Sequence, residues 1–267
     1  MIDGELAGKV AVVTGGSGGI GRAIVSLFCD QGATVVVADI DADRGREQVA
    51  ELGPSAAFCR TDVSDAGQVQ ALVDFAVATF GGLDVMCNNA GIPSSFRGLL
   101  DNDLRDAHKV LGVNLFGVMY GCRFAGLHMA GHGGGSIINT ASMGAITGGA
   151  GPIVYRTSKA AVIQFNRSAA SDLAQYGIRV NCIAPGHIDT GITTYDLGPV
   201  IRRSQPLQRQ GTAVDIANAA LFLASDRSAQ ITGIVLPVDG GTSAGPSATQ
   251  SQMLLAPDQG EGGHRAR

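Results

Sequence analysis

The stretch KVAVVTGGSGGIG, residues 9–21, decides the fold of this chain. An apolar run that ends at Thr14 passes directly into a glycine-rich turn, and the turn passes into a segment with helical periodicity. A glycine cluster alone is a weak signal, because ordinary turns are rich in glycine. With a strand before it and a helix after it, the turn fits a dinucleotide-binding unit, in which glycines let a pyrophosphate approach backbone amides at a helix N-terminus.

The same alternation of apolar runs and helical patterns continues along the chain. The runs are apolar on both faces, which is typical of parallel strands covered by helices, and Pro237 favours an edge position or a strand end for the last one. We therefore expect an α/β protein, a single-domain doubly wound Rossmann fold with a seven-stranded parallel sheet. The expected strands are Lys9–Thr14, Thr34–Asp39, Ala56–Arg60, Leu83–Asn88, Ser136–Thr140, Arg179–Ile183 and Ile234–Val238.

Local signals predict where some helices begin and where the domain ends. Ser64 is a plausible N-cap for the helix whose apolar stripe includes Val69 and Leu72, and Thr212 with Asp215 resembles a capping box. We expect the domain to span residues 1–241. The remainder, residues 242–267, is polar and is expected to be a C-terminal extension that is flexible or packed on a partner.

Composition excludes several classes of protein. The chain of 267 residues is 45% hydrophobic and 16% charged, with a net charge of −4, so it suits a compact globular protein and not a nucleic-acid binder. We expect no membrane span and no signal peptide. Five scattered cysteines favour a reducing compartment, most simply the cytoplasm. His128 and His132 lie four residues apart without an acidic or cysteine partner, so no metal site is expected.

Asp39, at the end of the second expected strand, lies 18 residues after Gly21. A carboxylate at this point accepts hydrogen bonds from an adenosine ribose and repels a 2′-phosphate. Asp41 and Asp43 add negative charge, and the glycine turn carries no arginine or lysine before position 22. We therefore expect NAD rather than NADP as the cofactor. In the alternative interpretation, Asp39 only caps a strand-to-helix turn.

Tyr155 and Lys159 are spaced i and i+4 in YRTSK, so they would share one face of a helix. At a separation of about 4 Å, the ammonium would attract a phenolate by about 4 kcal/mol, enough to lower a phenol pKa from about 10 to about 7. The pair would then be able to act in general acid–base catalysis. The alternative is a solvated helix face, and the spacing alone does not distinguish the two.

Taken together, the motifs resemble the classical short-chain dehydrogenase/reductase family, over roughly Leu6–Gly241. The resemblance implies hydride transfer between a nicotinamide cofactor and the carbon that bears the substrate oxygen, usually in a homotetramer. The matching pieces, in order, are TGGSGGIG (14–21), Asp62 with Val63, NNAG (88–91), Asn114, Ser142, YRTSK (155–159), PGHIDT (185–190) and VDGG (238–241).

The resemblance also implies a role for each matching residue. Tyr155 moves the hydroxyl proton, Ser142 positions the substrate oxygen, Lys159 binds the ribose and lowers the Tyr155 pKa, and Asn114 completes a proton path. Asp62 and Val63 would lie against adenine, and Thr190 would bond the carboxamide of the nicotinamide. The full expected cofactor-binding set is Gly15, Ser17, Gly19, Ile20, Gly21, Asp39, Ile40, Asp62, Val63, Asn89, Ala90, Gly91, Tyr155, Lys159, Pro185, Gly186, Ile188 and Thr190.

The residues expected to face the substrate are largely small or apolar. They lie in Ile92–Phe96, Gly144–Gly151 and Gly191–Gln205, which favours a neutral apolar secondary alcohol or ketone, alicyclic or steroid-like. Arg202 and Arg203 leave open a 3-oxoacyl-thioester reductase. A cofactor-binding regulator without catalysis is disfavoured by the intact Asn, Ser, Tyr and Lys set. A sugar-nucleotide epimerase would need a larger C-terminal domain.

Overall fold

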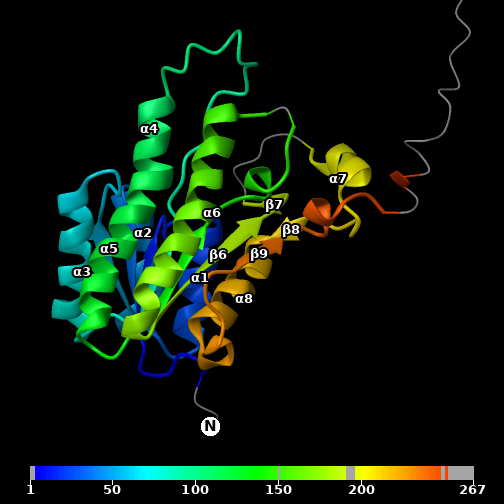
Figure 1. The fold of residues 1–267 in the computed structure, drawn as a ribbon. Helices are drawn as coiled ribbons and strands as arrows, with labels where there is room; N and C mark the ends of the chain where they lie inside the picture. The colour runs from blue at the N-terminus through cyan, green and yellow to red at the C-terminus, as the bar shows by residue number, and fades with distance from the viewer. Residues whose placement is uncertain (1–3, 150, 191–195, 248–249, 252–267) are drawn as a thin grey trace, which may run out of the picture.

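The computed structural model describes residues 4–149, 151–190, 196–247 and 250–251. Seven parallel strands form one sheet in the order β3-β2-β1-β4-β5-β6-β9, so the expected seven-stranded doubly wound α/β fold is confirmed (Figure 1). The strands are β1 (Val10–Thr14), β2 (Thr34–Asp39), β3 (Ala56–Arg60), β4 (Val85–Asn88), β5 (Gly135–Thr140), β6 (Ile178–Pro185) and β9 (Val235–Val238). Pro237 lies in the edge strand β9, as expected.

Helices cover both faces of the sheet (Figure 1). On one face, α1 (Gly19–Asp30), α2 (Ala42–Leu52) and α8 (Ala213–Ala224) pack over an apolar cluster that includes Val13, Val35 and Ile183. On the other face, α3 (Ala66–Phe80), α5 (Gly117–Ala130) and α6 (Ile153–Leu173) pack over a second cluster that includes Val12 and Ile137. Alternate residues of one strand enter opposite clusters, which explains why the runs are apolar throughout.

Several short elements were not expected from the sequence. A ladder of two short strands, β7 (Ile188–Asp189) and β8 (Gly211–Thr212), stands beside the main sheet. Between β4 and α5 lie α4 (Ala107–Leu111) and a π-helical turn, η2 (Gly112–Phe116), and α7 (Gly198–Ser204) precedes β8. The 3₁₀ turns are η1 (Gly53–Ser55), η3 (Met143–Ala145), η4 (Ala174–Tyr176), η5 (Asp226–Ser228) and η6 (Thr242–Ala244).

Helix α3 corrects one expectation about helix starts. Its N-cap is Asp65 and not Ser64, because the Asp65 carboxylate accepts hydrogen bonds from the amides of Gly67 and Gln68. Ser64 instead donates its hydroxyl and its amide to the carboxylate of Asp62. Asp65, one residue after Ser64, is an equally good N-cap and also provides a full negative charge at the helix N-terminus.

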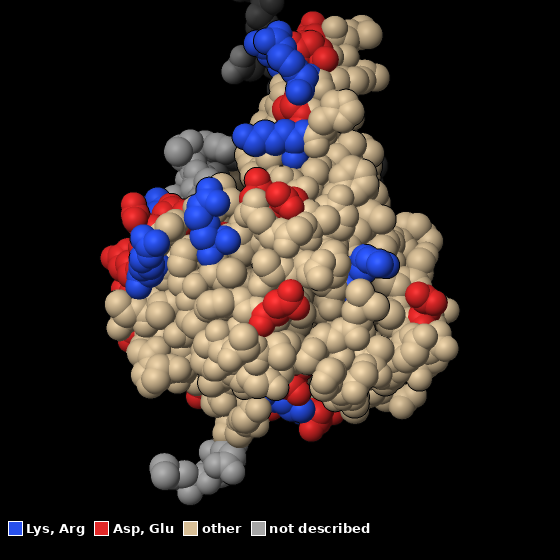
Figure 2. All heavy atoms as spheres, turned by 90° about the vertical axis from the view of Figure 1, so that its left-hand side faces the viewer, with Lys and Arg blue, Asp and Glu red and all other residues tan. Residues whose placement is uncertain are grey.

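The surface and the apolar helices bear on possible partners. Figure 2 shows charges of both signs scattered over the face that carries α3 and α5, with uncharged residues dominating its described centre.

The continuous helical stretch Ala107–Ala130 has a mean hydropathy of 1.4 and is long and apolar enough to cross a membrane. However, 44% of its apolar window is buried inside the fold, and its inner residues Val118, Cys122 and Met129 belong to the core. One face of this stretch therefore packs in the core of the fold.

The start of the C-terminal extension packs against its own chain. The side chain of Gln250 is only 5% exposed, and its amide donates to the carbonyls of Arg202 and Gln205 at 3.0 and 3.1 Å. This contact satisfies carbonyls at the end of α7, next to which the extension lies in Figure 1. Residues 252–267, where the extension was expected to be flexible or packed on a partner, lie outside the described residues.

The predicted capping box of α8 is present. The Thr212 hydroxyl accepts the Asp215 amide, and the Asp215 carboxylate accepts the Thr212 amide at 2.7 Å. We predict that Thr212→Ala lowers the free energy of unfolding by about 1 kcal/mol, because the first turn of α8 loses its cap. Urea denaturation measures this. The control Val214→Ala, at an exposed position of the same turn, should change stability by less than about 0.5 kcal/mol. Equal effects in both variants would contradict the role of the box.

Candidate active site

The glycine turn between β1 and α1 forms a cradle that side chains would fill. A Cβ added at Gly21 would lie 2.0 Å from the carbonyl oxygen of Gly15, whereas one added at Gly18 would meet only open space. Gly15 and Gly19 have φ values of 62° and 49°, which favour glycine. The N-cap Gly18 gives α1 no side-chain cap, so the amides of the first turn are available as donors. This geometry fits the pyrophosphate of a dinucleotide.

Asp39 reaches from the end of β2 to the glycine turn. Its Oδ2 accepts the Ser17 amide at 3.1 Å and the Ser17 hydroxyl at 2.5 Å, and its Oδ1 accepts the Asp41 amide. Ser17, expected to touch the cofactor, therefore has its hydroxyl committed to Asp39. A carboxylate offers about four acceptor positions, so these bonds leave room for a ribose. Ile40, the next residue, is 61% exposed, as a side chain that covers an adenine would be.

The segment after β4 is tied to the end of β1. The Thr14 hydroxyl accepts the amides of Asn89 and Ala90, and the Asn89 side chain donates to the carbonyls of Thr14 and Gly15. Asn89 thus shapes the glycine turn through its side chain. A Cβ added at Gly91 would lie 3.3 Å from Lys159 Nζ, so Gly91 allows the lysine to approach.

Two other groups of expected cofactor residues lie at the same edge. Asp62 and Val63 follow β3; the Asp62 carboxylate accepts both the amide and the hydroxyl of Ser64, and Val63 is buried. At the far side, Pro185 ends β6, Gly186 abuts Asp239, and Ile188 pairs with Gly211. A Cβ added at Gly19 would lie 3.3 Å from the Cβ of Thr190, so Thr190 packs against Gly19. Ile20 is partly buried against the core beneath α1.

Ser142 and Tyr155 meet as expected, but the pKa of the phenol moves in the opposite direction. Burial raises the pKa of Tyr155, and a hydrogen bond with the Ser142 side chain offsets part of that rise. Lys159 Nζ lies 5.9 Å from the centre of the Tyr155 ring. The expected fall in the Tyr155 pKa is therefore not found in the protein alone, because burial raises that pKa and Ser142 is the group that lowers it.

Lys159 is a buried cation held by one carbonyl. It is 2% exposed, and its Nζ donates to the Thr140 carbonyl at 2.7 Å, at the end of β5. Burial lowers the pKa of Lys159 to about 8. An ammonium has three donors, so two remain after the bond to Thr140, in reach of the space that Gly91 keeps open. These donors fit the hydroxyls of a ribose.

Asn114 lies in the π-helical turn η2, and its side chain is fully engaged. Its Oδ1 accepts the Ile92 amide at 2.8 Å, and its Nδ2 donates to the Ile92 carbonyl and to the Ser158 hydroxyl. Asn114 Oδ1 and Lys159 Nζ both flank Gly91, so the π-turn brings Asn114 beside the lysine. π-turns of this kind are frequent at functional sites.

Arg156, the residue after Tyr155 on α6, contacts the segment that precedes the helix. Its guanidinium donates to the Thr147 carbonyl, and its side chain lies against Gly144 and Gly151. These contacts of Arg156 stabilise the segment between β5 and α6. Part of this segment was expected to face the substrate. No local pattern marks this contact in the sequence, because it joins residues nine positions apart through a loop.

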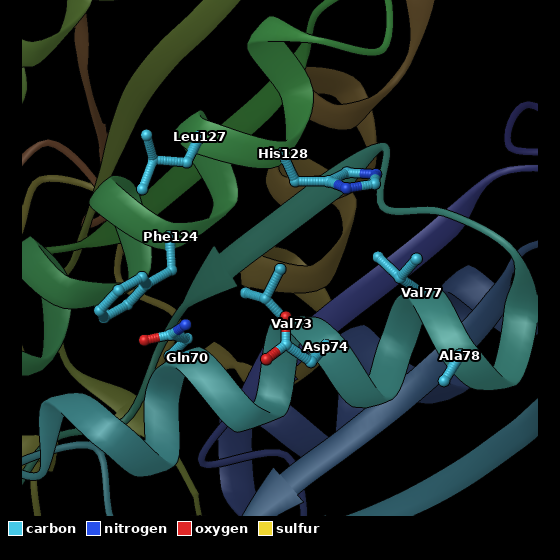
Figure 3. Close-up of a pocket in the computed structure, with 8 residues that line it drawn as sticks. All are labelled: Gln70, Val73, Asp74, Val77, Ala78, Phe124, Leu127 and His128. Atoms are coloured by element: carbon cyan, nitrogen blue, oxygen red, sulfur yellow. The ribbon is translucent and has the colours of Figure 1, made fainter.

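Two hollows of the described surface lie away from these residues. One, of about 430 Å³, opens between α3 and α5, and Figure 3 shows Gln70, Asp74, Phe124, Leu127 and His128 around it. Another, of about 770 Å³, follows α5 and α6 and is mostly apolar. Among the described residues, the groups of histidine, cysteine and acidic side chains include none that could hold a metal ion.

A family model described as enoyl-(acyl carrier protein) reductase matches residues 15–243. The chain belongs to the classical short-chain dehydrogenase/reductase family. It resembles a solved structure described as a putative short-chain alcohol dehydrogenase from Sinorhizobium meliloti 1021, with a TM-score of 0.85 and 33% identity over 90% of this chain and 98% of the other. The chain is therefore an oxidoreductase of a family that interconverts alcohols and ketones, typically with a nicotinamide cofactor.

Three curated relatives are similar over most of their length. Momilactone A synthase of Oryza sativa subsp. japonica is 45% identical over 90% of this chain and 91% of its own. The 2,5-dichloro-2,5-cyclohexadiene-1,4-diol dehydrogenase LinX of Sphingobium indicum is 39% identical, over 90% and 98%. The 3-oxoacyl-(acyl-carrier-protein) reductase FabG of Chlamydia pneumoniae is 40% identical, over 90% and 99%.

Proposed function

We propose that this enzyme is an NAD-dependent dehydrogenase that interconverts a neutral, apolar secondary alcohol and its ketone. The observation that carries the proposal is the meeting of Ser142, Tyr155 and Lys159 at the carboxyl edge of the sheet, next to the glycine turn and Asp39. Ligands of doubly wound sheets bind at this edge. An intact acid–base set at that place is also the argument against a regulator that only binds the cofactor.

Each residue of the proposed site has its own role in the oxidation of an alcohol. NAD, when bound, accepts the hydride from the carbon that carries the hydroxyl. Tyr155 takes the hydroxyl proton, so the alcohol loses a hydride and a proton and becomes a ketone. Ser142 holds the substrate oxygen beside the phenol, and Lys159 holds the ribose. A bound, oxidised nicotinamide would carry a positive charge that favours the phenolate and would oppose the rise in the Tyr155 pKa that burial causes.

Asp39 supports NAD over NADP as the cofactor. We predict that Asp39→Ala weakens NADH binding by about 10-fold or more, since charge-assisted hydrogen bonds are worth about 1.5–3 kcal/mol. NADPH binding should stay equal or improve, because the charge that repels the 2′-phosphate is gone. Titrations of cofactor fluorescence measure both affinities. Glu47→Ala, which removes an exposed acid further along α2, is the control and should leave the ratio unchanged. A wild-type preference for NADPH would refute the assignment of NAD.

The proposed substrate class rests on apolar side chains near the reacting residues. Phe96 is 70% exposed beyond β4, and Ile146 is exposed in the segment that Arg156 fastens. Leu197 is buried next to α7, whereas Ile192 and Tyr195 lie outside the described residues. The cyclohexadienediol named for the Sphingobium relative is an alicyclic secondary alcohol. A panel of cyclic secondary alcohols with NAD, followed by NADH absorbance, tests the proposal.

Reduction of a 3-oxoacyl thioester is the second candidate. The name of the Chlamydia relative and the basic pair Arg202 and Arg203 at the end of α7 favour it. The two candidates separate by cofactor and substrate, because a thioester reductase of this kind usually uses NADPH. Turnover of acetoacetyl thioesters with NADPH, and none of cyclic alcohols with NAD, would favour the second candidate.

The assembly and location of the enzyme are also proposed. We propose a cytoplasmic homotetramer, as the family usually forms. Leu127 and Tyr176 are exposed and line the hollow of α5 and α6, which supports a further copy as the occupant of that surface. Five free cysteines suit a reducing compartment. Light scattering should give a mass near four times the 27.2 kDa of the chain; a monomer mass would contradict the tetramer.

A further inference from the structure

Tyr155 lies in the first turn of α6, where the helix provides no hydrogen-bond acceptor for its amide. The helix begins at Ile153, its N-cap Pro152 has no capping side chain, and the Arg156 amide donates to the Pro152 carbonyl. The amide of Tyr155 therefore precedes the first bond within the helix. It donates instead to the hydroxyl of Ser94, at 3.0 Å, a residue 61 positions earlier in the chain. Ser94 is buried, so water does not compete for this bond.

The carbonyl of Tyr155 is also bound by a buried side chain. The hydroxyl of Ser158 donates to the Tyr155 carbonyl at 2.6 Å, and it accepts the side-chain amide of Asn114 at 3.1 Å. Ser158 and Asn114 are both fully buried. A hydroxyl has one proton and two lone pairs, so this arrangement uses Ser158 as both donor and acceptor.

The two contacts lead back to one short segment after β4. Asn114 binds both the amide and the carbonyl of Ile92, and Ser94 follows two residues later. Hydrogen bonds and peptide links therefore form a closed loop that includes the backbone of Tyr155. The loop runs through Ile92, Asn114, Ser158, Tyr155 and Ser94. The same segment ends near Phe96, whose ring is exposed on the side expected to face the substrate.

We propose that Ser94 is a positioning residue for Tyr155, which fixes the phenol relative to Ser142 and ties it to the substrate-side segment Ile92–Phe96. The proposal rests on the proposed function, because it assigns Ser94 a part in the proton transfer by Tyr155. Ser94 does not touch the reacting atoms; it acts through the peptide of the tyrosine. Proton transfer depends steeply on alignment, and a shift of about 1 Å costs up to about 100-fold in rate.

The test compares Ser94→Ala, Ser94→Thr and Ser171→Ala by steady-state kinetics with NAD and a cyclic secondary alcohol. We expect Ser94→Ala to lower kcat by about 10- to 100-fold with little change in KM. Threonine keeps the hydroxyl and should restore kcat to within a few-fold of wild type. Ser171→Ala is the control: Ser171 is exposed near the opposite end of α6 from Tyr155, so kcat should not change. NADH affinity should be the same in all variants.

A second measurement does not require a substrate. The ultraviolet absorbance of the phenolate, taken as the difference from Tyr155→Phe, follows the titration of Tyr155 alone. Ser142, which follows β5, and Lys159 on α6 are the groups that face the phenol. Since the bond with Ser142 lowers the Tyr155 pKa, a displaced phenol should titrate at higher pH in Ser94→Ala and at the wild-type pH in Ser171→Ala.

The outcomes separate this inference from the proposed function. Full turnover by Tyr155→Phe would refute the proposed function. Wild-type kcat in Ser94→Ala, with Tyr155→Phe inactive, would overturn the role of Ser94 alone, as would a change in KM without kcat or a failure of threonine to rescue. If the alanine variant does not fold, Ser94→Cys, which has a weaker acceptor of similar size, replaces it, and full kcat there overturns the proposal.

Discussion

Tyr155→Phe lowers kcat by about three orders of magnitude or more and leaves NADH binding intact; this is the largest effect that we expect. General acid–base groups contribute about 10²- to 10⁴-fold to the rate, and the phenol is the group placed to exchange the substrate proton. Phenylalanine keeps the ring and its packing, and removes only the oxygen that bonds with Ser142. Steady-state kinetics and a fluorescence titration with NADH separate the two effects.

A matched tyrosine provides the control for that prediction. Tyr176, in η4, is exposed and stands at the opposite end of α6 from Tyr155. Tyr176→Phe should therefore keep wild-type kcat and KM. Residual turnover of Tyr155→Phe within 10-fold of wild type would show that another group carries the proton, and the assignment of Tyr155 would be abandoned.

Lys159→Met gives the second large effect. We expect kcat to fall by about 100-fold and NAD affinity to fall as well, because the ammonium bonded to Thr140 is the donor nearest to the space for the ribose. Methionine has a similar length and no charge, so it fills the buried volume without a donor. A variant that loses turnover but binds NAD as tightly as wild type would contradict the role of Lys159 in holding the cofactor.

The same variant has a signature in the pH dependence of stability. Burial lowers the pKa of Lys159 from 10.5 to about 8 in the folded protein. Between pH 8 and pH 10.5 the unfolded chain therefore binds more protons at this position than the folded chain, and this lysine adds stability as the pH rises through that window. We predict that the free energy of unfolding of wild type, measured relative to Lys159→Met in urea, rises from pH 8 to pH 10. A difference that does not change with pH would contradict the buried cation.

The fold was largely predictable from the sequence because each strand contributes to both helical layers. Residues such as Val12 and Val13, adjacent in β1, face opposite clusters, so the whole run must be apolar. The ladder of β7 and β8 was missed because two residues per strand produce no periodicity. The start of α3 was assigned to Ser64 because serine and aspartate are equally good caps in a sequence.

The candidate site was predictable at the level of residues and not at the level of their electrostatics. The i, i+4 spacing indicated that Tyr155 and Lys159 share a helix face, and the structure brings both to the same edge. The spacing gives no measure of burial, however, and burial determines both of their pKa values. The roles of Ser94, Ser158 and Arg156 depend on contacts between α6 and other segments of the chain, which no pattern within one segment contains.

Transfer of a deuterium label tests whether the enzyme moves a hydride from the alcohol to NAD. The substrate is a cyclic secondary alcohol that carries deuterium on the carbon bearing its hydroxyl group, incubated with the enzyme and NAD in ordinary water. Mass spectrometry should find one deuterium on the reduced nicotinamide for each ketone formed, because a hydride passes directly to the cofactor while Tyr155 carries the exchangeable proton. Deuterium in the solvent, or ketone formed without reduced NAD, would contradict it.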